Sequence, residues 1–413
     1  MTSGLTCGIK LVGYGVDTLI LNVRYSDSSF APVKQELDET LQKELDYLQA
    51  SARQDENAVA TDWSFNGALL FVEPHGAGKQ WRWLLTCRWL TLVVSRGKFN
   101  DVIAQVRFSS EFLWSRKYTG DALYEVHTFL MSIFGEFIHL QVSEVHLCAD
   151  VTGYDFAQAD YEHSFVSRVR KNQALYETGV DRVALENRRV SMLTFSSHAA
   201  PISCVIYNKT LEIKQKSNKT WFYDLWRIGV DTEKGGKWDG ESDVWRVEYR
   251  FKRDFLHSLS EPIEQAYDLL GQFKPLWDYA AGHREGGDDG LPDGWLRYVL
   301  PDGDDTNRSR WPVHSAWNVV QSAFSIDLEP NLAAIVRQRV REKNVERGIA
   351  STIGYISTLA AWLGGEHVSP ESDLSVTLQW LYASGNDYLE EKHRDFINEV
   401  RKKQARYGSN DAA

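Results

Sequence analysis

The sequence predicts an α+β fold: a large antiparallel sheet with flanking helices, followed by a helical C-terminal unit. Short stretches that alternate polar and apolar residues follow one another with only Gly, Lys and Asn between them, which is typical of antiparallel meanders. Stretches with apolar residues at helical spacing separate them. From residue 328 to residue 407 the pattern stays helical.

The first expected strand covers residues 15–25, where Leu19, Leu21 and Val23 alternate with polar neighbours. The other expected strands are short and β-prone: 68–73, 81–86, 90–95, 103–108, 141–151, 190–196, 203–207 and 244–252. The first expected helix places Leu37 and Leu41 one turn apart. The expected helices are 33–53, 122–137, 159–171, 209–227, 260–282, 328–363 and 375–407.

These elements predict two parts of the chain. Residues 1–325 are expected to form one α+β domain, with a β-rich half over 1–140 and a half that carries the chemistry over 141–325. Residues 326–413 are expected to form a helical C-terminal region.

Composition excludes several classes of protein. With 413 residues, 43% of them hydrophobic and 25% charged, the chain is neither disordered nor fibrous. Apolar runs stay below the roughly 20 residues that span a bilayer, and the first ten residues lack an export signal, so we expect a cytoplasmic protein without a membrane partner. The four cysteines form no CxxC pair, which argues against a zinc ribbon or a disulfide framework.

The charge is unevenly distributed. A net charge of −11 argues against a protein that coats nucleic acid by bulk attraction. Acidic residues gather at 36–56 and 285–305, and basic residues at 209–219, 246–253 and 337–347. Such runs are usually solvated faces, but the separation predicts a locally positive surface.

The first stretch that could carry chemistry is 143–150. On a strand, Glu144, His146, Cys148 and Asp150 share one face. Burying carboxylates and an imidazole costs free energy unless they meet a charge or a metal. The alternative is an edge strand with its polar face in water.

The second stretch is 204–212, where a strand is expected to end at Tyr207 and a helix to begin shortly after it. Lys209 then lies near the same side of the junction. A tyrosine hydroxyl is a weak nucleophile at neutral pH, and a lysine or a divalent ion beside it favours the phenolate. The alternative is a core tyrosine with its hydroxyl at the rim.

The third stretch is 245–253. Arg246, Glu248, Arg250 and Lys252 fall on one strand face. This pattern fits an ion-pair ladder across strands, or a metal ligand in a phosphate-binding groove.

In this order and spacing, the three stretches resemble the replication initiation factor family, which comprises rolling-circle plasmid initiators and related relaxases of integrative and conjugative elements. The resemblance rests on Glu-Val-His-Leu-Cys-Ala-Asp at 144–150, on the strand–turn–strand at 192–207 ending in Ile-Tyr-Asn-Lys, and on Trp-Arg-Val-Glu-Tyr-Arg-Phe-Lys at 245–252. The segments 15–19 and 105–113 resemble the family too.

The resemblance implies a sheet related to the HUH nucleases with a degenerate metal site. It implies that Tyr207 is the nucleophile, assisted by Lys209, and that Asp150, Glu248 and His146 hold Mg²⁺ or Mn²⁺. Basic side chains would hold neighbouring DNA phosphates: Arg246, Arg250 and Lys252.

The implied function is metal-dependent, site-specific nicking and joining of single-stranded or hairpin DNA at a replication or transfer origin, through a 5′-phosphotyrosine. The same chemistry suits a plasmid initiator and a conjugative relaxase. The alternatives are a DNA-binding protein without catalysis on the same scaffold, and an α+β protein unrelated to DNA. The C-terminal helices, with their arginines at 337–347, could bind DNA, a helicase or a second copy of the chain, or form a solvated surface.

Overall fold

The computed structural model describes residues 8–27, 29, 33, 36–96, 101–116, 118–168, 182–186, 189–282, 294–305, 307–325, 345–362, 374–392, 395–398 and 400. Its contacts divide the chain into two compact units, residues 1–337 and 338–413.

The first unit is built on a sheet of 11 strands in the order β2-β3-β4-β5-β6-β1-β7-β12-β11-β10-β9. All of its strand pairs are antiparallel. In chain order the strands are β1 (Lys10–Tyr25), β2 (Val59–Phe65), β3 (Ala68–Val72), β4 (Trp83–Thr86), β5 (Leu90–Val94), β6 (Ala104–Phe108), β7 (Ile138–Thr152), β9 (Arg182–Glu186), β10 (Arg189–Phe195), β11 (Ile202–Asn208) and β12 (Val244–Lys252). A second sheet pairs β8 (Phe165–Ser167) with β13 (Leu296–Tyr298).

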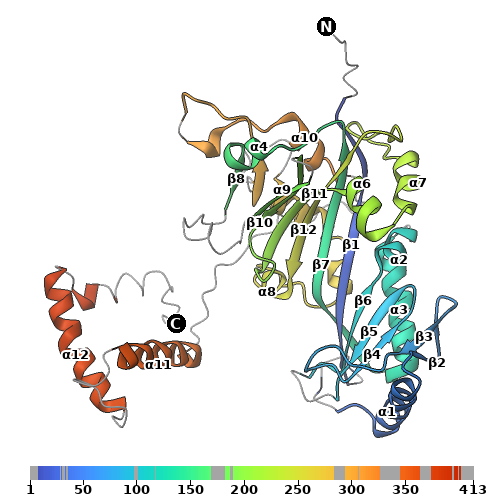
Figure 1. Cartoon of the computed structure of the whole chain (residues 1–413), viewed down its shortest axis with the longest axis horizontal. Coiled ribbons are helices and arrows are strands. Elements are labelled where there is room, and N and C mark those ends of the chain that lie inside the picture. Colours follow the sequence, from blue (N-terminus) through green and yellow to red (C-terminus); the bar gives the residue numbers. More distant parts are fainter. Residues whose placement is uncertain are drawn as a thin grey trace. The chain divides into compact units, whose positions relative to one another are not determined.

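Helices flank the large sheet (Figure 1). They are α1 (Glu39–Gln54), α2 (Ser110–Ser115), α3 (Thr119–Phe134), α4 (Gln158–His163), α6 (Lys209–Glu212), α7 (Trp221–Ile228), α8 (Arg253–Leu256), α9 (Phe273–Ala281) and α10 (Ser315–Gln321). The α+β class with a large antiparallel sheet and flanking helices is therefore confirmed.

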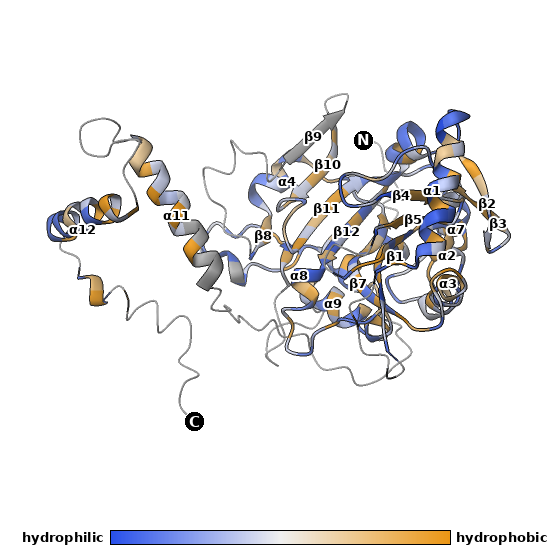
Figure 2. Cartoon of the chain, turned by 90° about the horizontal axis from the view of Figure 1, so that it is seen from below, coloured by the Kyte–Doolittle hydropathy of each residue, from blue (hydrophilic) through white to orange (hydrophobic). Residues whose placement is uncertain are grey.

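The central strands β7 and β12 separate an apolar face from a charged face by simple alternation. Tyr249 of β12 is fully buried and meets Trp277 of α9, ring centroids 5.3 Å apart, and Trp277 in turn meets Phe324. Strand residues next to Tyr249 point to the opposite face, which α2, α6 and α7 cover and which carries the polar site. Figure 2 shows hydrophobic stretches in strands of this sheet such as β4 and β10.

The segment 209–227 differs from the single helix that its pattern predicts. It forms α6, then a π-helical turn over Ile213–Ser217, then α7. Asn218 takes a left-handed conformation with φ 53°, which ends the first helical stretch and lets α7 start in a new direction. This break brings α7 against β1.

Four other expected helices are shorter than predicted. The one expected over 33–53 starts at Glu39, and the one expected over 375–407 ends at Glu391. Within 159–171, α4 ends at His163 and β8 follows at once, because Phe165–Ser167 pairs with β13. Within 260–282, regular α-helix starts at Phe273. Residues 328–344 and the basic run that begins at residue 337 lie outside the described residues, apart from the backbone of the last positions of that run.

The second unit contains two described helices, α11 (Val345–Trp362) and α12 (Leu374–Glu391). Its predicted helical character is thus confirmed over these residues. Among the helices that the structure describes, none combines the length and apolar character needed to cross a bilayer.

Candidate functional site

Strand register brings the three predicted stretches together. Tyr207 of β11 lies opposite Arg246 of β12, and Arg246 lies opposite Asp150 of β7. Two residues further along, Glu248 lies opposite Cys148, and after two more Arg250 lies opposite His146. Because side chains alternate across a strand, these residues share one face of three neighbouring strands.

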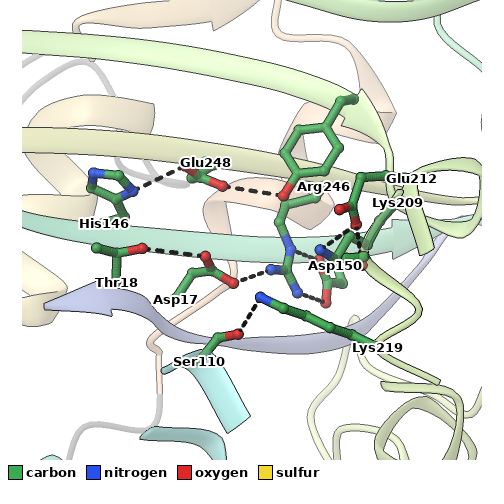
Figure 3. Close-up of polar contacts among 12 residues, drawn as sticks. Asp17, Thr18, Ser110, His146, Asp150, Lys209, Glu212, Lys219, Arg246 and Glu248 are labelled. Atoms are coloured by element: carbon green, nitrogen blue, oxygen red, sulfur yellow. Dashed lines mark hydrogen bonds and ion pairs between the residues drawn. The ribbon is translucent and has the colours of Figure 1, made fainter. Parts of the chain in front are cut away.

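A buried ion-pair cluster lies at the centre of this face. Arg246 is fully buried, and its Nε and Nη2 atoms donate to the two carboxylate oxygens of Asp150 at 2.7 and 2.8 Å. Its Nη1 atom donates to Asp17, and Trp226 donates to Asp150 Oδ2 at 2.9 Å. Figure 3 shows the guanidinium between the two aspartates. A guanidinium without exposure to water needs such partners, because an unpaired buried charge is strongly destabilising.

A β-bulge in β1 explains how Asp17 reaches this cluster. Val16 pairs with Leu147 and Thr18 pairs with His146, so Asp17 is an extra residue in the ladder. Bulges of this kind redirect a side chain, here toward Arg246.

An aromatic cover lies over the same face, next to two glycines of β1. A Cβ atom on Gly13 would lie 3.4 Å from Trp226, and one on Gly15 would lie 3.4 Å from Trp114. Phe222 of α7 completes the cover, with its ring centroid 4.4 Å from Arg246 Cζ. The break between α6 and α7 thus places aromatic rings directly over the buried cation.

A second chain of contacts starts at the Tyr207 hydroxyl, which donates to Glu248 Oε2 at 3.2 Å. Glu248 Oε1 is 3.1 Å from His146 Nδ1 and accepts from Arg250 Nε at 2.9 Å. His146 Nε2 is 2.6 Å from Glu144 Oε1. Tyr207 is half-buried, and the side chains of Arg250 and Glu144 retain 20% and 16% exposure. This series of hydrogen-bonded side chains therefore leads from the phenol toward the surface.

The charges and burial of these hydrogen-bonded residues determine which of them carry a proton. Burial and the Glu248 carboxylate raise the pKa of Tyr207 well above its ordinary value, while the charge of Arg246 works in the opposite direction. Burial opposes ionisation of Glu248, but a hydrogen bond from His146 and the charges of His146, Arg250 and Arg246 hold its pKa well below the ordinary value. Burial likewise opposes the His146 cation, but hydrogen bonds to both flanking carboxylates raise its pKa. At neutral pH the phenol is protonated and faces a carboxylate.

The β11–α6 junction supplies a further cation. Asn208 caps α6 by accepting from the backbone N–H of Leu211 at 2.9 Å. Lys209 is buried and donates to Glu212 at 2.6 Å, and its Nζ atom lies 5.6 Å from the centroid of the Tyr207 ring. The predicted proximity of a lysine to this tyrosine is present in the structure.

The structure separates the predicted site residues into two sets. Tyr207, Glu248, His146 and Arg250 form the hydrogen-bonded chain, and Asp150 and Arg246 form the ion-pair cluster. Lys252 lies in register with Glu144 at the outer end of the chain.

One predicted role needs correction. Arg246 has no exposed surface, and its donors are taken up by Asp17 and Asp150, so it does not face DNA phosphates in this conformation. Sequence reasoning also missed Asp17 and Trp226. Asp17 stands in an ordinary alternating strand pattern. The helical pattern over 209–227 does not show in which direction the indole of Trp226 points.

The side chains do not fit one shared divalent ion in this arrangement. Both oxygens of Asp150 accept from Arg246, and Oδ2 also accepts from Trp226. Glu248 instead contacts His146, Arg250 and Tyr207. Within the described part of the chain, no three His, Cys, Asp or Glu side chains are placed to hold a metal ion. The predicted Mg²⁺ or Mn²⁺ stays a prediction.

Among the comparisons with known proteins, only the one with solved structures finds a similarity. No family model matches the chain, and no curated protein matches it. Among solved structures, the chain is similar to a rolling circle replication initiator protein from Geobacillus stearothermophilus, with 12% sequence identity and a TM-score of 0.39. The match covers 79% of this chain and 100% of that protein.

Proposed function

We propose that the chain nicks and rejoins single-stranded DNA at a replication or transfer origin, with Tyr207 as the nucleophile, and so initiates rolling-circle replication. The observation that carries the proposal is the hydrogen bond from the Tyr207 hydroxyl to the buried carboxylate of Glu248. A nucleophile within hydrogen-bond reach of a base, which a third group orients, is the arrangement that covalent catalysis requires. Here His146 orients Glu248.

The bonds and protons of the proposed reaction balance as follows. The Tyr207 oxygen attacks a backbone phosphorus, the O–P bond forms, and the bond from phosphorus to the 3′ oxygen breaks. Glu248 accepts the phenol proton and then releases it to solvent, and the leaving 3′ oxygen takes a proton from solvent water to become a hydroxyl. The product is a 5′-phosphotyrosine and a free 3′-hydroxyl, and attack by a 3′-hydroxyl reverses the step.

The negative charge of the DNA substrate would help Glu248 to act as a base. The low pKa of Glu248 makes it a weak base in the free protein. A phosphodiester near Arg250 would draw that guanidinium away from the carboxylate and bring a negative charge, and both changes raise the proton affinity of Glu248. The fixed charge of Arg246 beneath the phenol would favour the phenolate.

The accessible cations suit the phosphates next to the scissile bond. Arg250 is partly exposed and Lys252 is half-buried at the strand end, whereas Lys209 is buried against the Tyr207 ring. Of the basic residues predicted to hold DNA, Arg250 and Lys252 therefore keep this proposed role.

One observation favours the alternative of DNA binding without catalysis. Burial raises the pKa of Tyr207, so the phenol of the free protein is a hydrogen-bond donor rather than a nucleophile. In that case the same cationic face would bind DNA and leave it uncut.

A covalent-adduct assay separates the two functions. Purified full-length chain is incubated with a pool of 3′-end-labelled random single-stranded oligonucleotides, in separate arms with Mg²⁺, with Mn²⁺ and with EDTA, and resolved on a denaturing gel. Nicking predicts a labelled protein band that Tyr207→Phe abolishes. The control is Tyr124→Phe, since Tyr124 is 68% exposed on α3 and belongs to no part of the site. DNA binding by the wild type without any adduct would favour the alternative.

A further inference from the structure

A basic pocket lies in the β-rich half of the first unit, apart from the Tyr207 site. It has a volume of about 650 Å³ and opens to solvent. It is formed by the C-terminal end of α1, the turn between β3 and β4, and the residues that follow β5. Its lining residues are Arg53, Gly76, Gly78, Lys79, Gln80, Trp81, Arg82, Ser95 and Arg96.

The arginines of the basic pocket are held in place by α1. Asp46 accepts from Arg82 Nη2 at 3.1 Å and from Arg96 Nη2 at 3.4 Å, which holds these two guanidinium groups side by side. Gln49, which is buried, accepts from Arg53 Nη2 at 2.8 Å and donates to the Arg82 carbonyl at 3.0 Å. The single carboxylate of Asp46 thus faces the guanidinium groups of Arg82 and Arg96, so this group of three side chains carries a net positive charge.

The turn between β3 and β4 closes the other side of the basic pocket. A Cβ atom on Gly76 would lie 2.2 Å from the carbonyl oxygen of Trp81, so only glycine allows the chain to fold back this tightly. Gly78 has a φ of 71° and precedes Lys79, which is exposed. The turn therefore presents an ammonium group beside the two guanidinium groups.

We propose that the basic pocket binds the phosphodiester backbone of duplex DNA that flanks the nicked segment. Four cationic side chains line one open cavity, although the net charge of the protein is −11. A general excess of basic residues therefore does not explain why they gather there. Arginine forks match the geometry of phosphate oxygens, and the partly exposed Trp81 ring offers an apolar wall for a sugar or base. The choice of DNA as ligand rests on the proposed function.

The sheet sets the distance between the two sites. Five strand spacings of about 4.8 Å separate β5 from β11, which is roughly 24 Å across the sheet. The end of β5 is level with Leu140 of β7 and Tyr207 is level with Asp150, and ten residues at about 3.3 Å each add roughly 33 Å along the strands, so the two sites lie roughly 40 Å apart. Figure 1 shows α1 and the strands β2 to β5 at the bottom of the first unit, with α6 and α7 toward its top. A B-form stem rises about 3.4 Å per base pair, so about twelve base pairs span this separation.

Stem length therefore provides the test. Binding of fluorescent DNA hairpins is measured by anisotropy in the Tyr207→Phe background, which prevents cleavage. One hairpin has a stem of about 5 base pairs, too short to reach the basic pocket, and the other has about 15. The pocket variant is Lys79→Gln/Arg82→Gln/Arg96→Gln. The matched control is Arg88→Gln/Arg227→Gln/Arg310→Gln, which removes three exposed charges elsewhere.

We expect the pocket variant to bind the long hairpin at least tenfold more weakly, with a shallower salt dependence, and to bind the short hairpin within about twofold of the parent. Lys79→Gln alone, at an exposed turn, should show part of the effect without any folding defect. Equal long-hairpin affinity for the pocket variant and the control would overturn the inference. So would equal losses on both hairpins.

A pyrophosphate arm distinguishes DNA from a free phosphate compound. If pyrophosphate binds the wild type, fails to bind the pocket variant and does not compete with the long hairpin, the site takes a small phosphate ligand and the DNA assignment is wrong. If neither hairpin binds the parent at all, the proposed function fails as well. If both bind but the pocket variant changes nothing, this inference alone fails.

Discussion

Replacing Asp150 by alanine is the sharpest test of how the charged face is held together. Asp150 has no exposed surface and accepts two hydrogen bonds from Arg246 and one from Trp226. The substitution leaves a buried guanidinium with Asp17 as its remaining anionic partner, and it leaves a buried indole N–H without an acceptor.

The expected loss of stability is large. Breaking a buried ion pair by removing one partner destabilises a protein by about 3–5 kcal/mol, because the other charge stays buried. The indole N–H of Trp226, which loses its acceptor, also destabilises the variant. Its effect and that of the broken ion pair are not additive, because both groups contact the same carboxylate. Unfolding in urea, followed by tryptophan fluorescence, measures the free energy of unfolding of Asp150→Ala against wild type.

The matched control is Asp224→Ala, which breaks an ion pair to Arg227 in which the aspartate side chain is 79% exposed. It should lie within about 1 kcal/mol of wild type. The combined change Asp150→Leu/Arg246→Met removes both charges and should recover more than half of the loss. If Asp150→Ala is no more destabilising than Asp224→Ala, the description of Arg246 as a buried cation that depends on its carboxylates is refuted.

Three further outcomes are expected. Tyr207→Phe should lower the free energy of unfolding by about 0.5–1.5 kcal/mol, because Glu248 keeps its other donors, so loss of nicking in this variant would not reflect unfolding. Hydrogen bonds to carboxylates raise the pKa of His146 despite its burial, so its stabilising effect is complete below about pH 6.5 and is lost as the pH rises through the raised value. Urea unfolding should therefore show that the difference in free energy of unfolding between wild type and His146→Gln shrinks as the pH rises above about 6.5. Lys209→Met should slow adduct formation at least tenfold, and Lys209→Arg should retain part of the rate, while circular dichroism stays near wild type because Glu212 still accepts from a serine hydroxyl.

Alternation along the strands made much of the charged face predictable. Because side chains of β7 and β12 point to opposite faces in turn, the sequence suffices to place Asp150 with His146 on one face of β7, and Arg246 with Glu248 on one face of β12. Antiparallel pairing of these strands then brings the two sets together.

Register was not predictable in the same way. Whether Glu248 lies opposite His146 or Cys148 depends on a two-residue shift that preserves every face, so the pattern alone does not fix which charges meet. The predicted metal site assumed that Asp150 and Glu248 share a partner, whereas Arg246 takes both oxygens of Asp150.

The contributions of Asp17 and Trp226 depend on irregular backbone. A bulge redirects Asp17, and a left-handed residue between α6 and α7 turns the indole toward Asp150. Both features are single-residue departures from a regular pattern, so periodicity does not detect them.

The central claim is that the hydroxyl of Tyr207 becomes covalently bonded to DNA. Its most direct test is peptide mapping by mass spectrometry of wild-type protein after reaction with a single-stranded oligonucleotide and nuclease trimming. We predict a nucleotide phosphate mass on the peptide that contains Tyr207, located on that side chain by fragmentation. An unmodified Tyr207 peptide in a sample that has cut its DNA, or the same mass on another residue, would contradict the claim.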